Sequence, residues 1–337
     1  MVLFLWIVIF IASLALLVKS ADLFVVNSEK IGLALKISPF IIGVTVVAIG
    51  TSFPELSSAV AAVMKGSTEI VVANIIGSNI ANIFLIIGIS SVIAKRLIVK
   101  RSLIDLDAPL LVTSSVLFLF IIIDKKIVAL EGALLLVAFI VYVLYTIFQR
   151  GDEKEKIKNF KIKDVDYKKK ESKGNSANIV KNNKTAGKKL SFNVFFFLIL
   201  GGFGLAIGAN YTIESVLKIA EIIGISASLI TITAVAIGTS LPELVVSVRA
   251  ATKKKYEIAL GNVFGSNVFN ILLVGGIPAL IKPLEIDELT FKIGIPFFVV
   301  ATLIFSISVI SRKIHIWEGL MYTILYILFI CNLIKII

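Results

Sequence analysis

One pair of motifs occurs twice in this chain. GTSFPEL at residues 50–56 recurs as GTSLPEL at 238–244, and GSNIAN at 77–82 recurs as GSNVFN at 265–270. Both motifs recur at the same offset, and the identities are densest among polar residues that interrupt apolar stretches. The chain therefore has to fold as two copies of one unit.

The composition requires a lipid environment for these two copies. Hydrophobic residues make up 58% of the 337 positions, charged residues 17%, and the mean hydropathy is +1.01. A water-soluble globule cannot bury so many apolar side chains, so we expect a polytopic membrane protein. A spanning helix needs about 20 mostly apolar residues. Ten segments meet this requirement: 2–28, 38–64, 70–94, 104–123, 127–148, 192–218, 226–251, 257–281, 291–310 and 316–336.

The ten expected spans divide evenly around one long polar segment, and the repeat offset maps the second and third spans onto the seventh and eighth. Because each half holds an odd number of spans, the second copy has to cross the membrane in the opposite direction. The expected fold class is all-α, with ten transmembrane helices arranged as two inverted five-helix repeats. The expected domains are a first repeat at 1–148, a linker at 149–190 and a second repeat at 191–337.

The orientation follows from lysine and arginine in the loops. These residues cluster at 95–101, 253–255 and 312–313, on the same side of the membrane as segment 149–190. An excess of positive charge marks the cytoplasmic side of a membrane protein. Segment 149–190 is polar and rich in lysine, so we expect a flexible cytoplasmic linker. We expect a multi-pass protein of the cell membrane with both termini outside.

Several classes of function are excluded by composition. The net charge of +12 is concentrated in the expected cytoplasmic loops, where anionic lipid accounts for it without a nucleic-acid partner. His315 is the only histidine and Cys331 the only cysteine, so neither a zinc site nor a Ser/His catalytic arrangement fits. We expect membrane lipid as a partner, no enzymatic activity and no bound cofactor. A monomer is sufficient for a site made from the two repeats.

Glu55 and Glu243 are the acidic residues of the repeated motifs. An acidic side chain in the middle of a hydrophobic span costs about 2.5–3.5 kcal/mol, so each should have a cation or a proton as its partner. Pro54 and Pro242 precede them, and proline removes a backbone donor, which predicts a kink or break in each helix. Broken helices at this depth line a buried or wet cavity. The freed backbone carbonyls near Ala48 and Ala236 are therefore candidate ligands.

The remaining polar residues of the motifs lie on helix faces with the two acids. Thr51 and Glu55 are four residues apart, as are Ser78 and Asn82. The candidate cluster around the two glutamates consists of Thr51, Ser52, Ser78, Asn82, Thr239, Ser240, Ser266 and Asn270. Gly77 and Gly265 are expected to permit close helix approach. For Asn79 and Asn267, interhelical hydrogen bonding and a place in the site are equally compatible with the pattern.

The chemistry of this set points to a hard cation. All the side chains offer oxygen and two are carboxylates, which suits Ca²⁺, since that ion takes six to eight oxygen ligands in flexible geometry. The neutral hydroxyl, amide and carbonyl oxygens around the carboxylates could instead hold Na⁺. Competition of two ions for shared ligands is a means of coupling their transport.

At these residues the chain resembles the cation/calcium exchanger superfamily, in its sodium/calcium exchanger branch and with the short central loop of the prokaryotic type. The paired G-T-S-x-P-E-L and G-S-N-x-x-N segments are similar to the two alpha-repeats of that family. The resemblance implies electrogenic exchange of Ca²⁺ for Na⁺ by alternating access, with Glu55 and Glu243 as central Ca²⁺ ligands. It also implies that the first and sixth helices form a moving gate. The flanking Na⁺ ligands it implies are Thr51, Ser52, Ser78, Thr239, Ser240 and Ser266, with Asn82 and Asn270 bordering the middle of the cluster.

Two departures from relatives refine this expectation. Some relatives carry aspartate at the place of Asn270, where it is associated with K⁺ transport, so K⁺ dependence is not expected here. The proton/calcium branch typically carries a G-N-x-x-E motif that is missing from these regions. An H⁺/Ca²⁺ antiporter and, at a greater distance, a cation channel stay open as alternatives. Outside the motifs, Lys19 and Asp22 are expected to pair with each other on the first helix.

Overall fold

The computed structural model describes residues 2–35, 38–99, 108–146, 191–223 and 240–334. Nearly all of this part is helical, and eight of its helices are long and apolar enough to cross a membrane. They are Val2–Ala34, Pro39–Met64, Glu69–Ala94, Ala129–Thr146, Phe192–Ile219, Tyr256–Ile281, Thr290–Ile310 and Ile316–Leu333. A shorter apolar helix covers Ala108–Asp124. The expectation of a helical multi-pass membrane protein is confirmed.

The expected span at 226–251 is described only in its second part, as α10 (Leu241–Thr252). The expected linker at 149–190 lies outside the described residues, as do the expected ligands Ala236 and Thr239.

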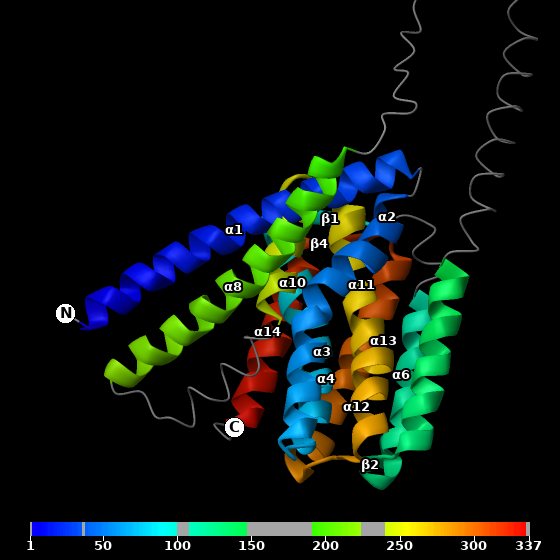
Figure 1. The fold of residues 1–337 in the computed structure, drawn as a ribbon. Helices are drawn as coiled ribbons and strands as arrows, with labels where there is room; N and C mark the ends of the chain where they lie inside the picture. The colour runs from blue at the N-terminus through cyan, green and yellow to red at the C-terminus, as the bar shows by residue number, and fades with distance from the viewer. Residues whose placement is uncertain (1, 36–37, 100–107, 147–190, 224–239, 335–337) are drawn as a thin grey trace, which may run out of the picture.

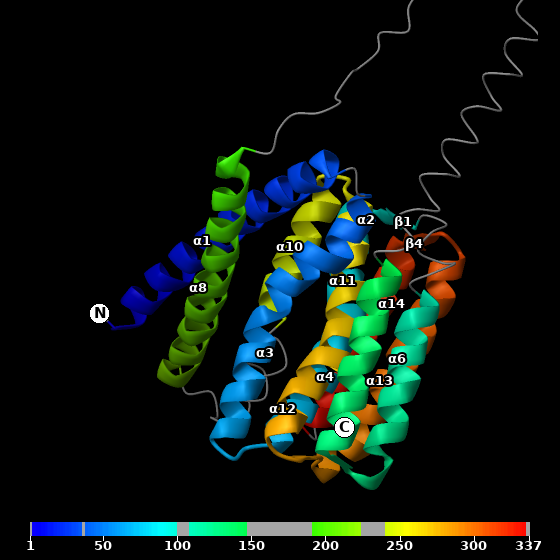
Figure 2. The same cartoon turned by 45° about the vertical axis from the view of Figure 1, so that its right-hand side comes forward.

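Two long helices lie together on one side of the molecule. α1 (Val2–Ala34) and α8 (Phe192–Ile222) pack against each other (Figures 1 and 2). The N-terminal end of α1 and the C-terminal end of α8 stand apart from the main bundle. A Cβ atom added at Gly208 of α8 would lie 3.0 Å from the backbone of Leu17 in α1, so the small residue permits this close approach. Ser13 and Thr212 join the two helices by a hydrogen bond of 3.0 Å.

The core of the bundle consists of helices that contain short π-helical segments. Its first-half elements are α2 (Pro39–Ile42), η1 (Gly43–Val47), α3 (Ala48–Met64), α4 (Glu69–Ile80), η2 (Ala81–Ile87) and α5 (Gly88–Ala94). Its second-half elements are α10, α11 (Tyr256–Phe269), η5 (Asn270–Val274) and α12 (Gly275–Ile281). Segments η1, η2 and η5 are π-helical, a form often found at functional sites.

The expected break is absent at one of the two prolines. α3 runs without interruption through Pro54, and the departure from α-helical winding lies earlier, in η1. At the second proline, α10 begins at Leu241, and residues 224–239 before it lie outside the described residues. Pro242 lies in the first turn of α10, where a missing backbone donor costs little.

One of the two motif glycines permits a close crossing of the halves. A Cβ added at Gly265 of α11 would clash with the Val44 carbonyl oxygen and lie 2.6 Å from the Ala48 Cβ. At Gly77 an added Cβ would meet none of the described residues within 4 Å. The repeat offset carries Val44 and Ala48 to positions 232 and 236, which lie outside the described residues, so the close approach expected at Gly77 stays a prediction.

The outer helices of the bundle are joined by two short strand pairs. The outer elements are α6 (Ala108–Ile121), η4 (Ile122–Asp124), the helix Ala129–Thr146, η6 (Thr290–Gly294), α13 (Ile295–Ile310) and α14 (Ile316–Leu333). Strand β1 (Arg96–Ile98) pairs with β4 (Lys313–His315), and β2 (Lys126–Ile127) pairs with β3 (Leu284–Glu285), both antiparallel. The two pairs lie at opposite ends of the bundle (Figures 1 and 2).

The register of the strand pairs follows the repeat. Leu97 pairs with Ile314, and Lys126 pairs with Glu285. The offset between the two copies of the motifs carries Lys126 onto Ile314 and Leu97 onto Glu285, so each pairing maps onto the other. The repeat seen in the buried motifs therefore extends to the ends of the bundle.

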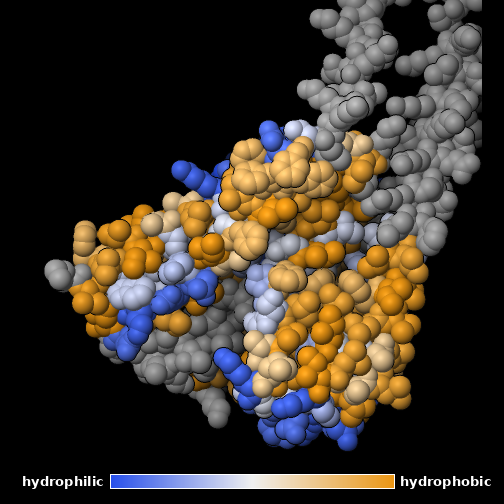
Figure 3. All heavy atoms as spheres, viewed as in Figure 1, coloured by the Kyte–Doolittle hydropathy of each residue, from blue (hydrophilic) through white to orange (hydrophobic). Residues whose placement is uncertain are grey.

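The outer surface of the bundle is apolar along most of its length. On the face shown in Figure 3, hydrophobic side chains cover the right-hand flank and hydrophilic ones gather at its lower end. Phe120, Ile307 and Trp317 are among the exposed large apolar side chains. Such a surface is stable in contact with lipid acyl chains.

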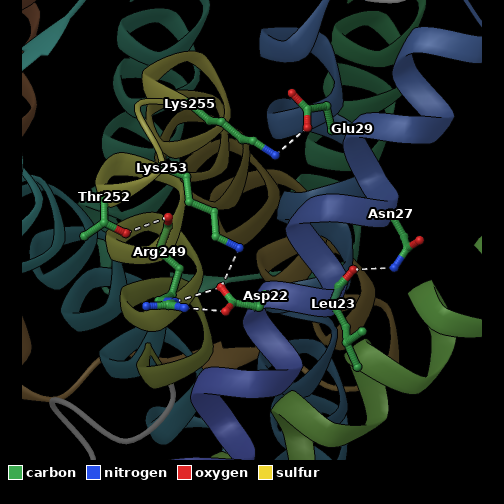
Figure 4. A network of polar contacts seen from close by, with 8 residues as sticks. All are labelled: Asp22, Leu23, Asn27, Glu29, Arg249, Thr252, Lys253 and Lys255. Carbon is green, nitrogen blue, oxygen red and sulfur yellow. Dashed lines mark hydrogen bonds and ion pairs between the residues drawn. The ribbon is translucent and has the colours of Figure 1, made fainter.

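Acidic residues of α1 pair with basic residues of α10 and the loop that follows it (Figure 4). Asp22 accepts hydrogen bonds from Arg249 and lies 2.9 Å from the Lys253 Nζ. Glu29 pairs with Lys255. The expected pairing of Lys19 with Asp22 is wrong, because Arg249 of α10 and Lys253 of the loop after it occupy the Asp22 carboxylate.

Candidate ion-binding site

The two glutamates of the repeated motifs meet in the centre of the bundle. Glu55 lies on α3 and Glu243 in the first turn of α10, and both side chains are fully buried. The two carboxyl groups are close enough to interact with each other. An acid from each half of the chain therefore contributes to one buried cluster, as the sequence predicts.

Most of the carboxylate oxygens accept no hydrogen bond from the described residues. Ser52 donates to Glu243 Oε1 at 2.9 Å, while Glu243 Oε2 and both oxygens of Glu55 have no such donor. Leaving a buried carboxylate without hydrogen bonds or a counter-charge is costly. The site therefore offers three oxygens that a bound cation or proton would satisfy.

Further hydroxyl groups of the two motifs are buried in the same bundle. Ser78 on α4 and Ser240 next to α10 have their Oγ atoms 2.9 Å apart, and Asn270 donates to Ser78 Oγ at 3.1 Å. Ser266 on α11 is buried and its hydroxyl has no hydrogen-bond partner among the described residues. Both motifs therefore contribute buried neutral oxygens as well as the two acids.

Two asparagines of the cluster belong to π-helical segments. Asn82 lies in η2 and Asn270 begins η5, and both side chains are buried. Each uses its amide nitrogen as a donor, Asn82 to Asn267 Oδ1 at 3.0 Å and Asn270 to Ser78. Their carbonyl oxygens accept no hydrogen bond from described residues. The π-helical turns thus present two further free oxygens.

Asn79 and Asn267, whose role the sequence does not decide, differ in their contacts. Asn267 takes part in the interhelical hydrogen bond with Asn82. Asn79 is fully buried, and neither end of its amide has a partner among the described residues. Interhelical bonding therefore accounts for Asn267 and not for Asn79.

The contacts of Thr51 connect the site to a residue that the motif analysis missed. The Thr51 hydroxyl lies 3.3 Å from the Ala48 carbonyl oxygen, a candidate ligand, and 3.1 Å from Asn262 Oδ1. Asn262 lies on α11, four residues before Ser266. The signal that could have found it is its recurrence, because the repeat offset places Asn74 at the equivalent position of the first half.

Five side-chain hydrogen bonds in this cluster join one half of the chain to the other. The bonds run from Ser52 to Glu243, between Ser78 and Ser240, from Asn270 to Ser78, from Asn82 to Asn267 and from Thr51 to Asn262. The motif residues therefore form one cluster with contributions from both repeats, and not two separate sites.

The donor set is composed of oxygen. Among the described residues no group of three or more histidine, cysteine, aspartate or glutamate side chains could hold a metal ion. Two carboxylates with neutral hydroxyl and amide oxygens fit a hard cation such as Ca²⁺ or Na⁺, and not a transition metal, which favours nitrogen and sulfur.

Comparisons with known proteins agree over most of the chain. Residues 5–148 and 193–335 match the family described as sodium/calcium exchanger protein. The sodium/calcium exchanger MaX1 of Methanosarcina acetivorans is 35% identical over 341 residues, covering 96% of each chain. An uncharacterized membrane protein of Methanocaldococcus jannaschii, MJ0091, is 32% identical, again covering 96% of each. A solved structure of the sodium-calcium exchanger NCX_Mj, soaked with zero Na⁺ and Ca²⁺, superposes with a TM-score of 0.76 at 29% identity, covering 98% of this chain and 99% of that one.

Proposed function

This chain belongs to the sodium/calcium exchanger family, and we propose that its antiport of Ca²⁺ against Na⁺ takes place at the cluster around Glu55 and Glu243. The observation that carries the proposal is the meeting of these two acids. Each is fully buried, each comes from a different repeat, and three of their four oxygens lack hydrogen bonds from described residues. The transported ions are its substrates, and the family is one of transporters, not of enzymes.

The ligand set supports competition between the two ions. One Ca²⁺ would be neutralised by the two carboxylates and completed by the free oxygens of Asn82 and Asn270. Na⁺ would bind at flanking positions that combine a carboxylate oxygen with neutral ones. The flanking ligands we propose are the hydroxyls of Thr51, Ser52, Ser78, Thr239, Ser240 and Ser266 and the carbonyls of Ala48 and Ala236. Since both ions need Glu55 and Glu243, only one set is bound when the site turns over.

We propose ten membrane helices in two inverted repeats, 1–148 and 191–337, joined by the cytoplasmic linker 149–190. The pairing of β1 with β4 and of β2 with β3 supports this arrangement, because each pairing maps onto the other at the repeat offset. Alternating access would proceed by movement of α1 and α8, which pack on each other beside the core. Exchange of one Ca²⁺ for several Na⁺ would be electrogenic, and both termini would be outside.

Flux measurements on purified protein test this function. Liposomes that contain the protein and are loaded with Na⁺ should take up labelled Ca²⁺ when external Na⁺ is removed. A membrane potential imposed on the liposomes should change the rate if transport is electrogenic. Uptake driven by a pH gradient without Na⁺ would assign the chain to H⁺/Ca²⁺ exchange, and single-ion conductance would assign it to a channel.

Substitution of the acids tests the site. Glu55→Gln and Glu243→Gln should each abolish Ca²⁺ uptake while the protein stays folded and monodisperse in detergent. Glu288→Gln is the matched control, because Glu288 is exposed and pairs with Lys125 and Lys292. Hydrogen bonds from Lys125 and, to a smaller extent, from Lys292 hold the pKa of Glu288 below its ordinary value. Glu288 is therefore ionised at neutral pH, and this variant also removes one negative charge. Normal exchange by either buried variant would refute the site.

A further inference from the structure

Asn262 uses its whole side-chain amide within or beside the ion-binding cluster. The side chain is fully buried on α11. Its Oδ1 accepts from Thr51 at 3.1 Å, and its Nδ2 donates to Ser247 Oγ at 2.9 Å and lies 3.4 Å from the Glu243 backbone oxygen. One amide therefore connects α3 of the first repeat with α10 of the second.

The orientation of this amide is set by its neighbours. If the Asn262 side chain were reversed, its oxygen would face the Glu243 carbonyl oxygen, and two acceptors would oppose each other. The amide nitrogen therefore faces Glu243, and the amide oxygen faces Thr51. That oxygen can only accept, and at 3.1 Å it lies nearer to the Thr51 hydroxyl than the Ala48 carbonyl oxygen does at 3.3 Å, so we assign the single hydroxyl proton to the contact with Asn262.

The direction of the Thr51 hydroxyl decides what it can offer an ion. With its proton committed to Asn262, the hydroxyl oxygen keeps lone pairs for a cation. Without that acceptor, the Thr51 hydroxyl could donate its proton to a Glu55 or Glu243 oxygen. That carboxylate oxygen would then be less available to an ion. We propose that Asn262 is a positioning residue that holds Thr51 as an ion acceptor. This inference rests on the function proposed above.

Flux through two variants tests the proposal. Asn262→Leu removes the acceptor at similar volume and should weaken apparent Na⁺ affinity about tenfold, the effect of one hydrogen bond. The apparent Ca²⁺ affinity should change by less, because the two carboxylates supply most of that binding. Asn262→Asp keeps an acceptor beside Thr51 and should retain the wild-type Na⁺ affinity more closely than the leucine variant. Asn332→Leu, on α14 with a contact to its own helix, is the control.

A double-mutant cycle separates positioning from general stability. Thr51→Val and Asn262→Leu should each lower apparent Na⁺ affinity, and the double variant should be little worse than either one. Additive losses, or Na⁺ affinity in Asn262→Leu equal to that of the wild type, would overturn the positioning role. If Asn262→Leu does not fold, the test uses Asn262→Asp. An apparent Na⁺ affinity of Asn262→Asp as low as that of Thr51→Val would then overturn the positioning role. Wild-type exchange that depends on Glu55 would still support the proposed function in each case.

A second, independent observation concerns the ion pairs between α1 and the core. Asp22 binds Arg249 through both carboxylate oxygens and also lies near Lys253, while Glu29 pairs with Lys255 (Figure 4). These side chains are only partly exposed, from 20% for Lys255 to 33% for Arg249 and Lys253. Such pairs are screened by solvent less than fully exposed ones.

The position of these pairs gives them a consequence for transport. They lie where α10 ends in the loop 253–255, on the side that the lysine and arginine pattern assigns to the cytoplasm. Any movement of α1 away from α10 on that side has to separate them. We infer that these ion pairs hold α1 against α10 and so keep the path from the cytoplasm to the ion-binding cluster closed. We refer to the pairs of Asp22 and Glu29 with the basic residues as the clasp. This inference also rests on the proposed alternating access.

Cross-linking tests the clasp in a Cys331→Ala background. Asp22→Cys with Lys253→Cys, joined by a bifunctional thiol reagent of matching length, should block Na⁺-driven Ca²⁺ uptake, and reductive release should restore it. Ser13→Cys with Thr212→Cys, joined in the same way, should leave uptake intact, because these positions lie within the α1–α8 pair. Full uptake with the first cross-link complete, or loss of uptake with the second, would contradict the clasp. Ca²⁺ uptake by the unlinked variants tests the proposed function separately.

Discussion

Ser52 on α3 donates a hydrogen bond to the Glu243 carboxylate on α10 at 2.9 Å. The equivalent serine of the second repeat, Ser240, contacts Ser78 and not Glu55. The two acids are therefore equivalent in sequence but different in surroundings. Glu243 has one oxygen satisfied by a hydroxyl, whereas both oxygens of Glu55 are free of hydrogen bonds from described residues.

Ser52→Ala should weaken Ca²⁺ binding. The hydroxyl stabilises the ionised form of Glu243, and a hydrogen bond to a charged group contributes about 1.5–3 kcal/mol. We expect the apparent Ca²⁺ affinity, measured from the concentration dependence of uptake, to fall at least about tenfold. Ser91→Ala is the control, because Ser91 is equally buried and bonds only to Gly88 of its own helix. Equal affinities for Ser52→Ala and the control would contradict this interpretation.

Glu55→Gln should make the ion-free protein more stable while removing its response to Ca²⁺. The substitution replaces a buried acid, whose carboxyl oxygens accept no hydrogen bond from described residues, with a neutral amide of the same shape. Thermal unfolding in detergent with a chelator should therefore occur at a higher temperature than for the wild type. Added Ca²⁺ should raise the unfolding temperature of the wild type alone, since a ligand stabilises only the state that binds it.

Gly265→Ala should lower the temperature of thermal unfolding. The substitution places a Cβ against the Val44 carbonyl, and overpacking of this kind costs about 1–3 kcal/mol. The measurement is thermal unfolding of the purified variant beside the wild type in the same detergent. An unchanged or higher unfolding temperature would show that the crossing of η1 and α11 is not tight.

Exchange should be independent of K⁺. The position of Asn270 offers an uncharged carbonyl oxygen, and its amide nitrogen is committed to Ser78. Asn270→Asp adds a third carboxylate to the cluster, which should favour an additional monovalent cation. Ca²⁺ uptake should therefore be unaffected by K⁺ in the wild type and become sensitive to it in this variant. A K⁺ requirement in the wild type would contradict the role of Asn270.

The sequence predicts the membrane class and the central residues because both depend on strong energetic demands. A glutamate in an apolar span needs a partner, and the repeat shows that Glu55 and Glu243 have equivalent places. The uninterrupted course of α3 through Pro54 could not be predicted in the same way, because a proline inside a helix can kink it without ending it, and the local sequence does not decide between the two. Asn262 was missed because it lies outside the two short motifs, and its recurrence as Asn74 in the first half is its one sequence signal.

The pairing of Asp22 shows a different reason for error. A lysine three residues away on the same helix is a sufficient partner in an isolated segment, and the sequence does not reveal which helix comes next to it. In the folded chain Arg249 can form two parallel hydrogen bonds with the carboxylate, which a lysine cannot. Contacts across 227 positions of sequence depend on packing that the local pattern does not contain.

The strand pairs at the two ends of the bundle join residues of one half to residues of the other. Together with the interlocked helices between them, they make the halves partners in a single body whose cohesion does not depend on the segment that connects them. A protein expressed as two separate polypeptides, 1–148 and 191–337, should accordingly assemble in the membrane and purify as one unit. Gene duplication and fusion would then have linked covalently two chains that already assembled through the same interface.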